Sequence, residues 1–280
     1  GEQSFEKAFE WEKRAAEEGK DTWAMDSVGF HYRVGLGCKK DLNESLVWYK
    51  KAYDNGDLSA SSEIGTIYFW LGDYKNSQKW FSIAVEAGDP SAALNLGLLY
   101  EEGSDNIPPD YIQASFYLHI AAKAGITKAK YRLGYLNYLG HGVFHRDFAE
   151  ACKWFAEAAE EGDIESQYTL AYLYHHGLGV EYDWKKAAYW YEKAAQRGHR
   201  LSQIDLADLL AQSDHQQYEK AIYWYNKAAE QNSVEAHRKL GDMYSFGIGC
   251  NKDQFLAMEH YRLAAQQGEQ IAVSRLKQSI

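Results

Sequence analysis

Two adjacent histidines, His175 and His176, are the side chains in this sequence that most readily suggest chemistry. Imidazole groups bind Zn²⁺ and transfer protons near neutral pH. Adjacent residues of a helix do not face the same way, so this pair is a poor bidentate metal site. His141 and His145 lie upstream, and no cysteine or carboxylate joins them at ligand spacing. The sequence therefore predicts solvated or stacked histidines, with no metal and no cofactor.

Known catalytic motifs give no better candidate. The tripeptide at residues 145–147, His-Arg-Asp, matches part of a kinase catalytic loop, but the glycine-rich loop and the downstream Asp-Phe-Gly are missing. No Gly-x-Ser-x-Gly elbow, phosphate-binding loop, dinucleotide fingerprint or His-Glu-x-x-His helix occurs. The sequence predicts a protein that is not an enzyme. A metal-dependent enzyme is a distant alternative, which metal-dependent turnover lost on His175→Ala would revive.

Composition limits the partners. The chain has 280 residues, 46% of them hydrophobic, and a net charge of −10. It can bury a sizeable core, and its acidity argues against nucleic acid and favours basic protein partners. No apolar run approaches the roughly 20 residues of a membrane span, and the N-terminus lacks signal-peptide character. We expect a soluble protein, although a leader removed before residue 1 would leave no trace.

The elements that position these side chains are repeated. An aromatic residue recurs every 32 to 37 residues, with an alanine four residues later and a glycine, or once Asn232, eight residues later. Residues four apart share one helical face, and glycine or asparagine suits a left-handed helix cap. We call this helix B of each unit. Its predicted packing anchors are Trp11, Trp48, Trp80, Tyr117, Trp154, Trp190 and Trp224, with His260 in the eighth place.

A second column of small residues predicts another helix in each unit, helix A. Pairs of small residues five apart, such as Ala24 with Gly29 and Ala236 with Gly241, lie about twenty residues ahead of the later anchors. Small side chains at this spacing in an amphipathic segment let a neighbouring helix approach closely. Each unit is therefore predicted to be a helical hairpin, and the hairpins are predicted to stack along one axis.

The joint between the two helices carries a family resemblance. It reads GLGCKKD at 35–41, GHGVFHRD at 140–147, GLGVEYD at 177–183 and GIGCNKD at 247–253, followed by Trp-Tyr-x-x-Ala-Ala-x-x-Gly in its fullest form. Over nearly the whole chain this pattern resembles the Sel-one-like repeat (SLR) family, relatives of tetratricopeptide repeats.

The resemblance implies an all-α fold, a right-handed α-solenoid of stacked helical hairpins forming one domain over residues 1–280. The expected parts are a lone helix B at 3–19, repeats at 20–56, 57–88, 89–125, 126–162, 163–198, 199–232 and 233–268, and a terminal helix at 269–280.

Some joints depart from the pattern. The second and sixth repeats lack Gly-x-Gly, so their hairpins should turn more tightly. In the third repeat, Pro108 and Pro109 predict a stiff, projecting loop. Cys38 and Cys250 occupy the same joint position in the first and seventh repeats and are expected to be buried packing residues too far apart for a disulfide.

Binding residues are expected on helix A, which lines the concave face in tetratricopeptide geometry. The candidates are Phe30, Arg33, Phe69, Lys128, Tyr131, Tyr135, Tyr138, Glu165, Tyr168, Tyr172 and His175. The five tyrosines would form a floor in the fourth and fifth repeats, with Lys128 and Glu165 at its rim. Tyrosine is favoured at recognition surfaces, although some of these rings can instead pack between helices.

The resemblance implies a non-catalytic adaptor or scaffold, which binds a protein or peptide on its concave face; the acidity of the chain favours a basic segment in that partner. The alternative is a bacterial inhibitor or immunity protein that occludes a toxin or enzyme. The bacterial cytoplasm or periplasm is the expected location, and the oligomeric state is left open.

Overall fold

A computed structural model describes residues 2–19, 21–104, 108–141, 145–212 and 215–278. It divides into two compact units, residues 1–145 and 146–280, and each is described by itself. Unit 1 holds α1 (Glu2–Gly19), α2 (Thr22–Val34), α3 (Leu42–Asp54), α4 (Ala60–Trp70), α5 (Tyr74–Glu86), α6 (Pro90–Glu102), α7 (Tyr111–Lys123) and α8 (Thr127–Leu139). Unit 2 holds α9 (Phe148–Glu160), α10 (Ile164–His176), α11 (Trp184–Gln196), α12 (Arg200–Ala211), α13 (Tyr218–Glu230), α14 (Val234–Phe246), α15 (Gln254–Gln266) and α16 (Gln270–Gln278).

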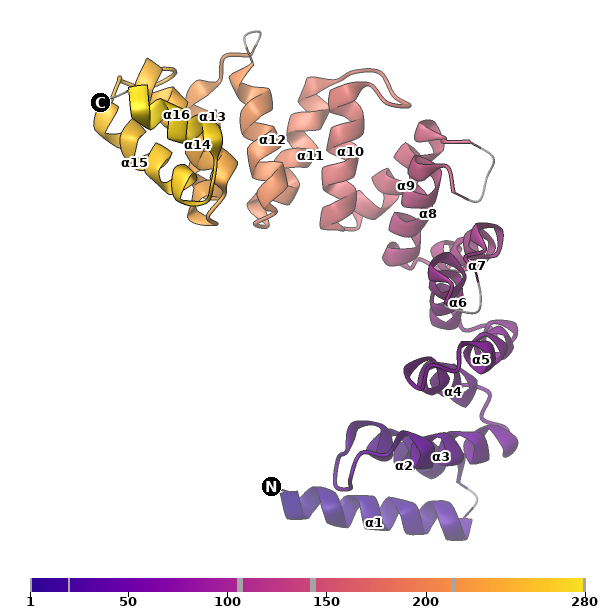
Figure 1. The fold of residues 1–280 in the computed structure, drawn as a ribbon. Coiled ribbons are helices and arrows are strands. Elements are labelled where there is room, and N and C mark those ends of the chain that lie inside the picture. Colours follow the sequence, from indigo (N-terminus) through magenta and orange to yellow (C-terminus); the bar gives the residue numbers. More distant parts are fainter. Residues whose placement is uncertain (1, 20, 105–107, 142–144, 213–214, 279–280) are drawn as a thin grey trace. The chain divides into compact units, whose positions relative to one another are not determined.

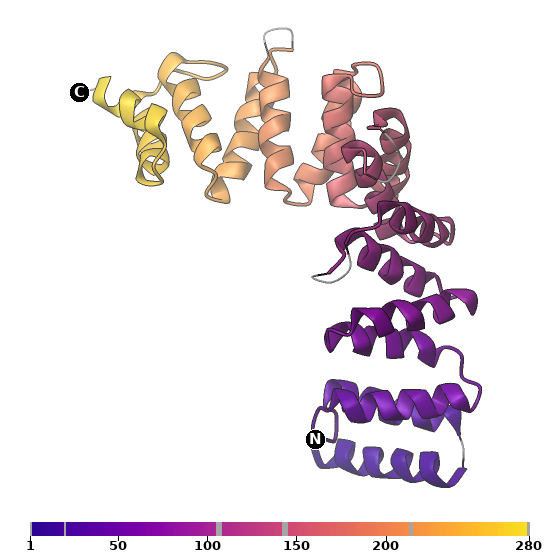
Figure 2. The same ribbon diagram turned by 45° about the vertical axis from the view of Figure 1, so that its right-hand side comes forward.

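The predicted all-α fold of stacked helical hairpins is confirmed (Figures 1 and 2). In unit 1 the hairpins α2/α3, α4/α5 and α6/α7 pack in succession, and in unit 2 the hairpins α10/α11, α12/α13 and α14/α15 do the same. Even-numbered helices are the predicted A helices and odd-numbered helices the B helices. Within the described ranges, no helix combines the length and apolar character that crossing a membrane requires.

Helix ends follow from the loop aspartate and the terminal glycine of the repeat. Asp183 is the N-cap of α11, and its side chain accepts hydrogen bonds from the backbone N–H groups of Lys185 and Lys186. The predicted left-handed caps are confirmed at Gly198, with φ of 85°, and at Asn232, with φ of 58°. Gly19 differs from this prediction, because it is the last residue of α1 and lies outside the left-handed region.

The deepest side chains of the B helices lie one residue after the predicted anchors. They are Tyr49, Phe81, Leu118, Phe155, Tyr191, Tyr225 and Tyr261, each at most 2% exposed. A Cβ added to Gly241 would lie 2.6 Å from Cδ1 of Tyr261, and one on Gly65 would lie 2.7 Å from Cδ1 of Phe81. The predicted close approach at the small residues is therefore confirmed, but the ring that approaches belongs to the column after the anchor.

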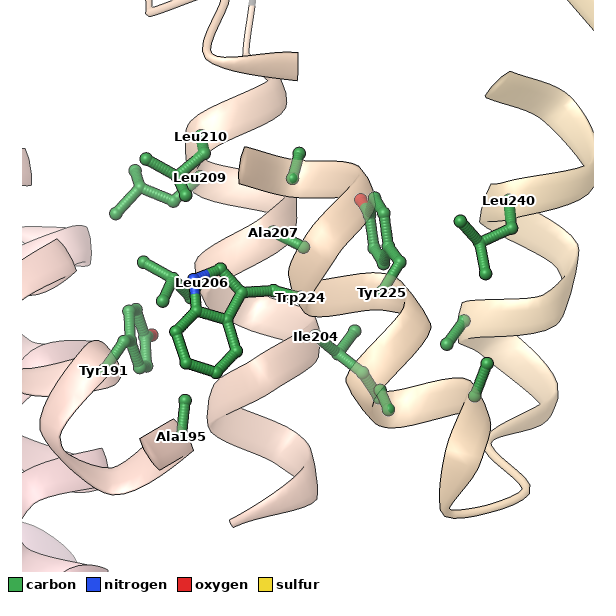
Figure 3. Close-up of a cluster of buried hydrophobic side chains, with 14 of the residues drawn as sticks. Tyr191, Ala195, Ile204, Leu206, Ala207, Leu209, Leu210, Trp224, Tyr225 and Leu240 are labelled. Carbon is green, nitrogen blue, oxygen red and sulfur yellow. The ribbon is translucent and has the colours of Figure 1, made fainter. Parts of the chain in front are cut away.

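The anchors themselves are less uniformly buried. Trp48 and Trp224 are buried, Trp80, Tyr117, Trp154 and Trp190 are half-buried, and Trp11 is 68% exposed. Trp80 meets Tyr53 of the preceding B helix edge to face, with ring centroids 5.0 Å apart. Trp224 belongs to one buried cluster with Tyr191 and Ala195 of the preceding hairpin (Figure 3). At Trp11 no burial supports an anchor role.

The Gly-x-Gly joints pack onto the preceding B helix. Gly179 has φ of 69°, and a Cβ there would lie 2.3 Å from the backbone carbon of Phe148 at the start of α9. Only glycine combines this conformation with so close a contact. The connection at 71–73 is tighter, as predicted, whereas the one at 212–217 is only one residue shorter than 177–183 and includes undescribed residues.

Two other joint predictions are only partly met. Cys38 and Cys250 are half-buried rather than buried, because they lie in the joints outside the interior of the hairpins. Both are free thiols, as is the buried Cys152 of α9. Pro108 and Pro109 are exposed, but the preceding residues 105–107, like 142–144 of another joint, lie outside the described residues.

Candidate partner-binding surface

The A helices of each unit lie side by side, and we call the surface they form the A-helix face. It comprises α2, α4, α6 and α8 in unit 1, and α10, α12, α14 and α16 in unit 2. Charged side chains pair across neighbouring A helices. The pairs are Arg33 with Glu63 at 3.1 Å, Arg132 with Glu101 at 3.2 Å, Lys239 with Asp208 at 2.6 Å and Arg275 with Asp242 at 3.4 Å. In each pair, one member stands three residues after the first small residue of its helix, and we call this the ladder position. The series of pairs repeats with the hairpins, and we call it the ladder of charged pairs.

Phe30 and Arg33, two of the predicted binding residues, lie together on α2. The Arg33 guanidinium lies 5.2 Å from the centroid of the Phe30 ring and 5.9 Å from that of Trp70 on α4. Because Glu63 also holds this guanidinium, the cation is fixed over two aromatic rings.

A pocket of 220 Å³ opens between α4 and α6, where the ladder of charged pairs is interrupted. Asn95 stands at the ladder position, and no charged pair joins the described residues of these two helices. Phe69, a predicted binding residue, lines the pocket with Trp70 and Leu98. Phe69 is 39% and Trp70 49% exposed, so both rings remain available to a ligand. The sequence reading missed Trp70, which directly follows Phe69 where the short joint begins.

The tyrosines of α8 form a row in unit 1. Tyr135 stacks with Tyr131 at 6.1 Å and with Tyr138 at 6.4 Å between ring centroids. Tyr135 is exposed, and so is Lys128, one turn before Tyr131. The structure thus brings together the members of the predicted tyrosine floor that belong to unit 1.

Tyr168 and Glu165 of α10 have structural partners in unit 2. The Tyr168 ring lies 5.9 Å from Tyr191 and 4.9 Å from His199, and it packs against the buried core. Glu165 is exposed and pairs with His199 at 3.6 Å. Tyr168 is therefore one of the rings that pack between helices, which was the alternative to a role in partner binding.

The adjacent histidines of α10 stack on each other. The ring centroids of His175 and His176 lie 4.7 Å apart, and His176 also contacts Tyr172 at 4.2 Å. Of the two predicted alternatives, solvated or stacked histidines, the structure shows stacking, although adjacent helical residues were not expected to face the same way. Burial, followed by the charge of His176, lowers the pKa of His175, so His175 is neutral at pH 7. In the part of the chain that the structure describes, no three His, Cys, Asp or Glu side chains are grouped to hold a metal ion.

Besides Glu165, the A helices of unit 2 carry the carboxylates of Asp205, Asp208 and Asp242. Asp208 accepts hydrogen bonds from Tyr225 and Lys239 and lines a 540 Å³ groove that reaches Asp242. Burial raises the pKa of Asp205 to about 6, against the opposing hydrogen bond from Tyr168. Asp205 stands at the ladder position of α12. It could have been found in the sequence by comparing the residue at this position from repeat to repeat.

The family assignment follows from the repeats. A profile described as Sel1 repeat matches residues 1–20, 24–57, 70–89, 90–126, 127–163, 164–199, 201–233 and 234–269. The chain belongs to the Sel1-repeat family. The profile leaves out residues 58–69, which lie largely in α4, the first helix of the hairpin with the shortest joint. Sel1-repeat proteins generally mediate protein–protein interactions and are typically non-catalytic.

Two solved Sel1-repeat structures from bacteria resemble this chain. Protein c5321 of Escherichia coli, a protective antigen of uropathogenic strains, is 30% identical with a TM-score of 0.81, over 96% of this chain and 58% of its own. A Sel1 repeat protein from Oxalobacter formigenes is 29% identical with a TM-score of 0.73, over 99% and 81%. The chitin synthase regulator SKT5 of Malassezia restricta is 40% identical over 65 residues, which are 23% of this chain and 4% of the regulator. This Sel1-repeat chain thus spans little more than half of the first relative and a small part of the regulator.

The predicted tyrosine floor is divided between the two units of this Sel1-repeat chain. Lys128, Tyr131, Tyr135 and Tyr138 belong to unit 1, whereas Glu165, Tyr168, Tyr172 and His175 belong to unit 2. A continuous floor across them stays a prediction, and each half is considered on its own A-helix face.

Proposed function

We propose that this Sel1-repeat chain is a non-catalytic adaptor that binds a protein or peptide segment on its A-helix face. The observation that carries the proposal is the 220 Å³ pocket between α4 and α6, with the half-exposed rings of Phe69 and Trp70 at its wall. Aromatic rings beside an apolar pocket are typical of the residues that dominate binding energy at protein interfaces. A pocket of this size suits one large apolar side chain of the partner.

The charge of the chain supports a basic partner segment. The net charge is −10, and on the A-helix face of unit 2 the carboxylates of Asp208 and Asp242 line the open groove. Opposite charge across an interface steers association and sets specificity. We therefore infer a partner with an apolar residue for the pocket of unit 1 or basic residues for the face of unit 2.

Affinity capture from a native extract tests the proposal. The full chain, its Phe69→Ala variant and its Phe116→Ala variant serve as baits, followed by mass spectrometry. Phe116 is the matched control, since it is a phenylalanine of unit 1 that is 57% exposed but lies on the B helix α7.

A protein retained by the wild-type chain and by Phe116→Ala, but lost from Phe69→Ala, is the expected result. Equal retention by all three baits, with unchanged circular dichroism and melting temperature, would place binding away from the pocket. A micromolar dissociation constant is expected for an exchangeable adaptor, in contrast to the picomolar values that tight inhibitors reach.

A further inference from the structure

The pocket between α4 and α6 is lined by polar groups as well as by rings. Phe69 and Trp70 of α4 and Leu98 of α6 give it an apolar wall. Asn95 and Glu102, both on α6, add an amide and a carboxylate to its lining. These two residues are seven positions apart, so they lie on one face of α6, about 10 Å apart along its axis. Along this helix the pocket therefore presents an amide, an apolar wall and a carboxylate in that order.

The amide of Asn95 is available to a partner. Glu63 and Arg132, at the ladder positions of α4 and α8, are held by ion pairs with neighbouring A helices. The side chain of Asn95, at the same position of α6, forms no hydrogen bond within the described ranges. A carboxamide offers one donor group and one acceptor, and so does each residue of a peptide backbone. Asn95 can therefore pair with the N–H and C=O groups of an extended segment.

The carboxylate of Glu102 lacks a cation. Glu102 is exposed and forms no ion pair in the part of the chain that the structure describes, whereas the adjacent Glu101 is held by Arg132 at 3.2 Å. Glu102 is also the last residue of α6, where the backbone carbonyls at the helix end add partial negative charge. A lysine or arginine of the partner would neutralise this end of the pocket.

We propose that the pocket receives an extended partner segment in which a large apolar residue stands two positions from a lysine or arginine. The apolar side chain packs against Phe69 and Trp70, the backbone pairs with Asn95, and the cation pairs with Glu102. The assignment rests on the proposed adaptor role and names the segment that the pocket recognises.

The dimensions of an extended chain fit this arrangement. Such a chain advances about 3.3 Å per residue, so three residues cover the distance from Asn95 to Glu102. Side chains two positions apart point to the same side of an extended chain. The apolar and the basic side chain of the segment therefore face the pocket together, while the residue between them faces away.

Three peptides test the recognised chemistry. The probe is acetyl-Lys-Ser-Phe-Ser-Lys-amide, whose two lysines meet the spacing in either chain direction. Acetyl-Glu-Ser-Phe-Ser-Glu-amide reverses the charge, and acetyl-Lys-Ser-Ala-Ser-Lys-amide removes the apolar side chain. Titration of the probe into the full isotope-labelled chain is expected to give saturable NMR shifts of the Trp70 indole and the Asn95 side-chain amide. Both control peptides are expected to bind at least about threefold more weakly.

Two outcomes of these titrations would overturn the assignment. Equal binding of the three peptides would show that neither the charge nor the apolar side chain is recognised. Probe-induced shifts that are absent from the pocket, or confined to other residues, would show that the segment does not bind there.

Two variants with the same loss of charge test the role of Glu102. Glu102→Gln is expected to weaken the probe about threefold, the scale of an exposed ion pair, and to lose most of the preference for the lysine over the glutamate peptide. Glu86→Gln is the matched control, because Glu86 is an exposed carboxylate at the last residue of α5 and does not line the pocket. Preference kept in Glu102→Gln, or lost equally in both variants, would contradict the assignment.

Asn95→Leu tests the pairing with the backbone. Leucine has nearly the shape of asparagine and adds apolar surface to the wall. We expect it to weaken the probe about fivefold, because the peptide backbone leaves water without a new partner. Equal or tighter binding would show that the pocket recognises apolar surface alone. Asn95→Ala gives the same comparison if Asn95→Leu lowers the melting temperature.

The captured partner separates this assignment from the adaptor role. A dissociation constant that rises in Phe69→Ala, but not in Asn95→Leu or Glu102→Gln, would overturn the recognised segment and leave the adaptor role standing. A constant unchanged in all three variants would remove both.

Discussion

At the scale of single residues, the side chains of Asp205 and Tyr191 in unit 2 are expected to have measurable effects on stability. The pKa of Asp205 is raised from 3.8 to about 6, because burial disfavours its charged form. The folded chain therefore holds the Asp205 proton more tightly than the unfolded chain, and stability falls as pH rises from about 4 to above 6.

Asp205→Asn removes this cost. At pH 7 we expect it to raise the free energy of unfolding by on the order of 2 kcal/mol, whereas near pH 4 the gain should vanish. Urea unfolding of the wild type and the variant at both pH values measures the difference. A gain of the same size at both pH values would show that ionisation of Asp205 is not its source.

Two tyrosines make a second prediction at this scale. Tyr191→Phe removes a buried hydroxyl that has no hydrogen-bond partner among the described residues, whereas Tyr225→Phe removes one that donates to Asp208. We expect Tyr191→Phe to leave stability unchanged or raise it by up to about 1 kcal/mol, and Tyr225→Phe to lower it by about 1–2 kcal/mol. Denaturant unfolding of both variants measures the two changes in the free energy of unfolding. A larger loss of stability in Tyr191→Phe than in Tyr225→Phe would mean that the Tyr191 hydroxyl is paired.

At the scale of elements, the joint glycines differ in what surrounds them. Gly179 and Gly198 both have positive φ, but an added Cβ would meet the α9 backbone at Gly179, whereas at Gly198 it would meet no atom of the described residues within 4 Å. Replacing Gly198 by alanine should cost about 1 kcal/mol from backbone strain alone. Replacing Gly179 should cost clearly more, since the joint must also move off α9. Equal melting temperatures of the two variants would show that the contact at Gly179 does not hold the joint.

The elements also show how much the sequence could predict. Period, small residues and terminal glycines predicted the hairpins, because each has a local cause in helix geometry. The sequence could not tell which of two neighbouring rings, Trp190 or Tyr191, turns toward the A helix, since both lie near one apolar stripe. In α1 the buried residues are Phe9 and Ala16, which belong to one cluster with Met25 and Val28 of α2, whereas Trp11 is 68% exposed.

The binding face was predicted less completely for a related reason. Phe69 was found because it stands at a recognised helix A position, but the pocket around it depends on how far α4 and α6 are spaced. That Asp205 has no ion pair among the described residues becomes visible only when the residues of two neighbouring helices are compared. The pattern of residues within single helices does not show it. The sequence pattern within each repeat therefore predicts the helices, but it does not predict the contacts between neighbouring repeats.

At the scale of the whole molecule, stability should be a sum of nearest-neighbour contacts, as in other repeat arrays. Trp224→Ala removes a buried ring from the cluster that joins α11 and α13, and we expect it to cost about 3–5 kcal/mol locally. Hydrogen exchange should then speed up in α12 and α13 and stay unchanged in α2 and α3. Uniform acceleration throughout the chain would show that the array unfolds as one cooperative body.

The central claim is that the A-helix face binds the partner, and one calorimetric titration tests it most directly. The captured partner is titrated into the wild-type chain, Phe69→Ala and Phe116→Ala. We predict that Phe69→Ala raises the dissociation constant at least about tenfold, as loss of an aromatic side chain that becomes buried in an interface does, while Phe116→Ala leaves it unchanged. The opposite order, or equal constants for all three folded proteins, would contradict the account.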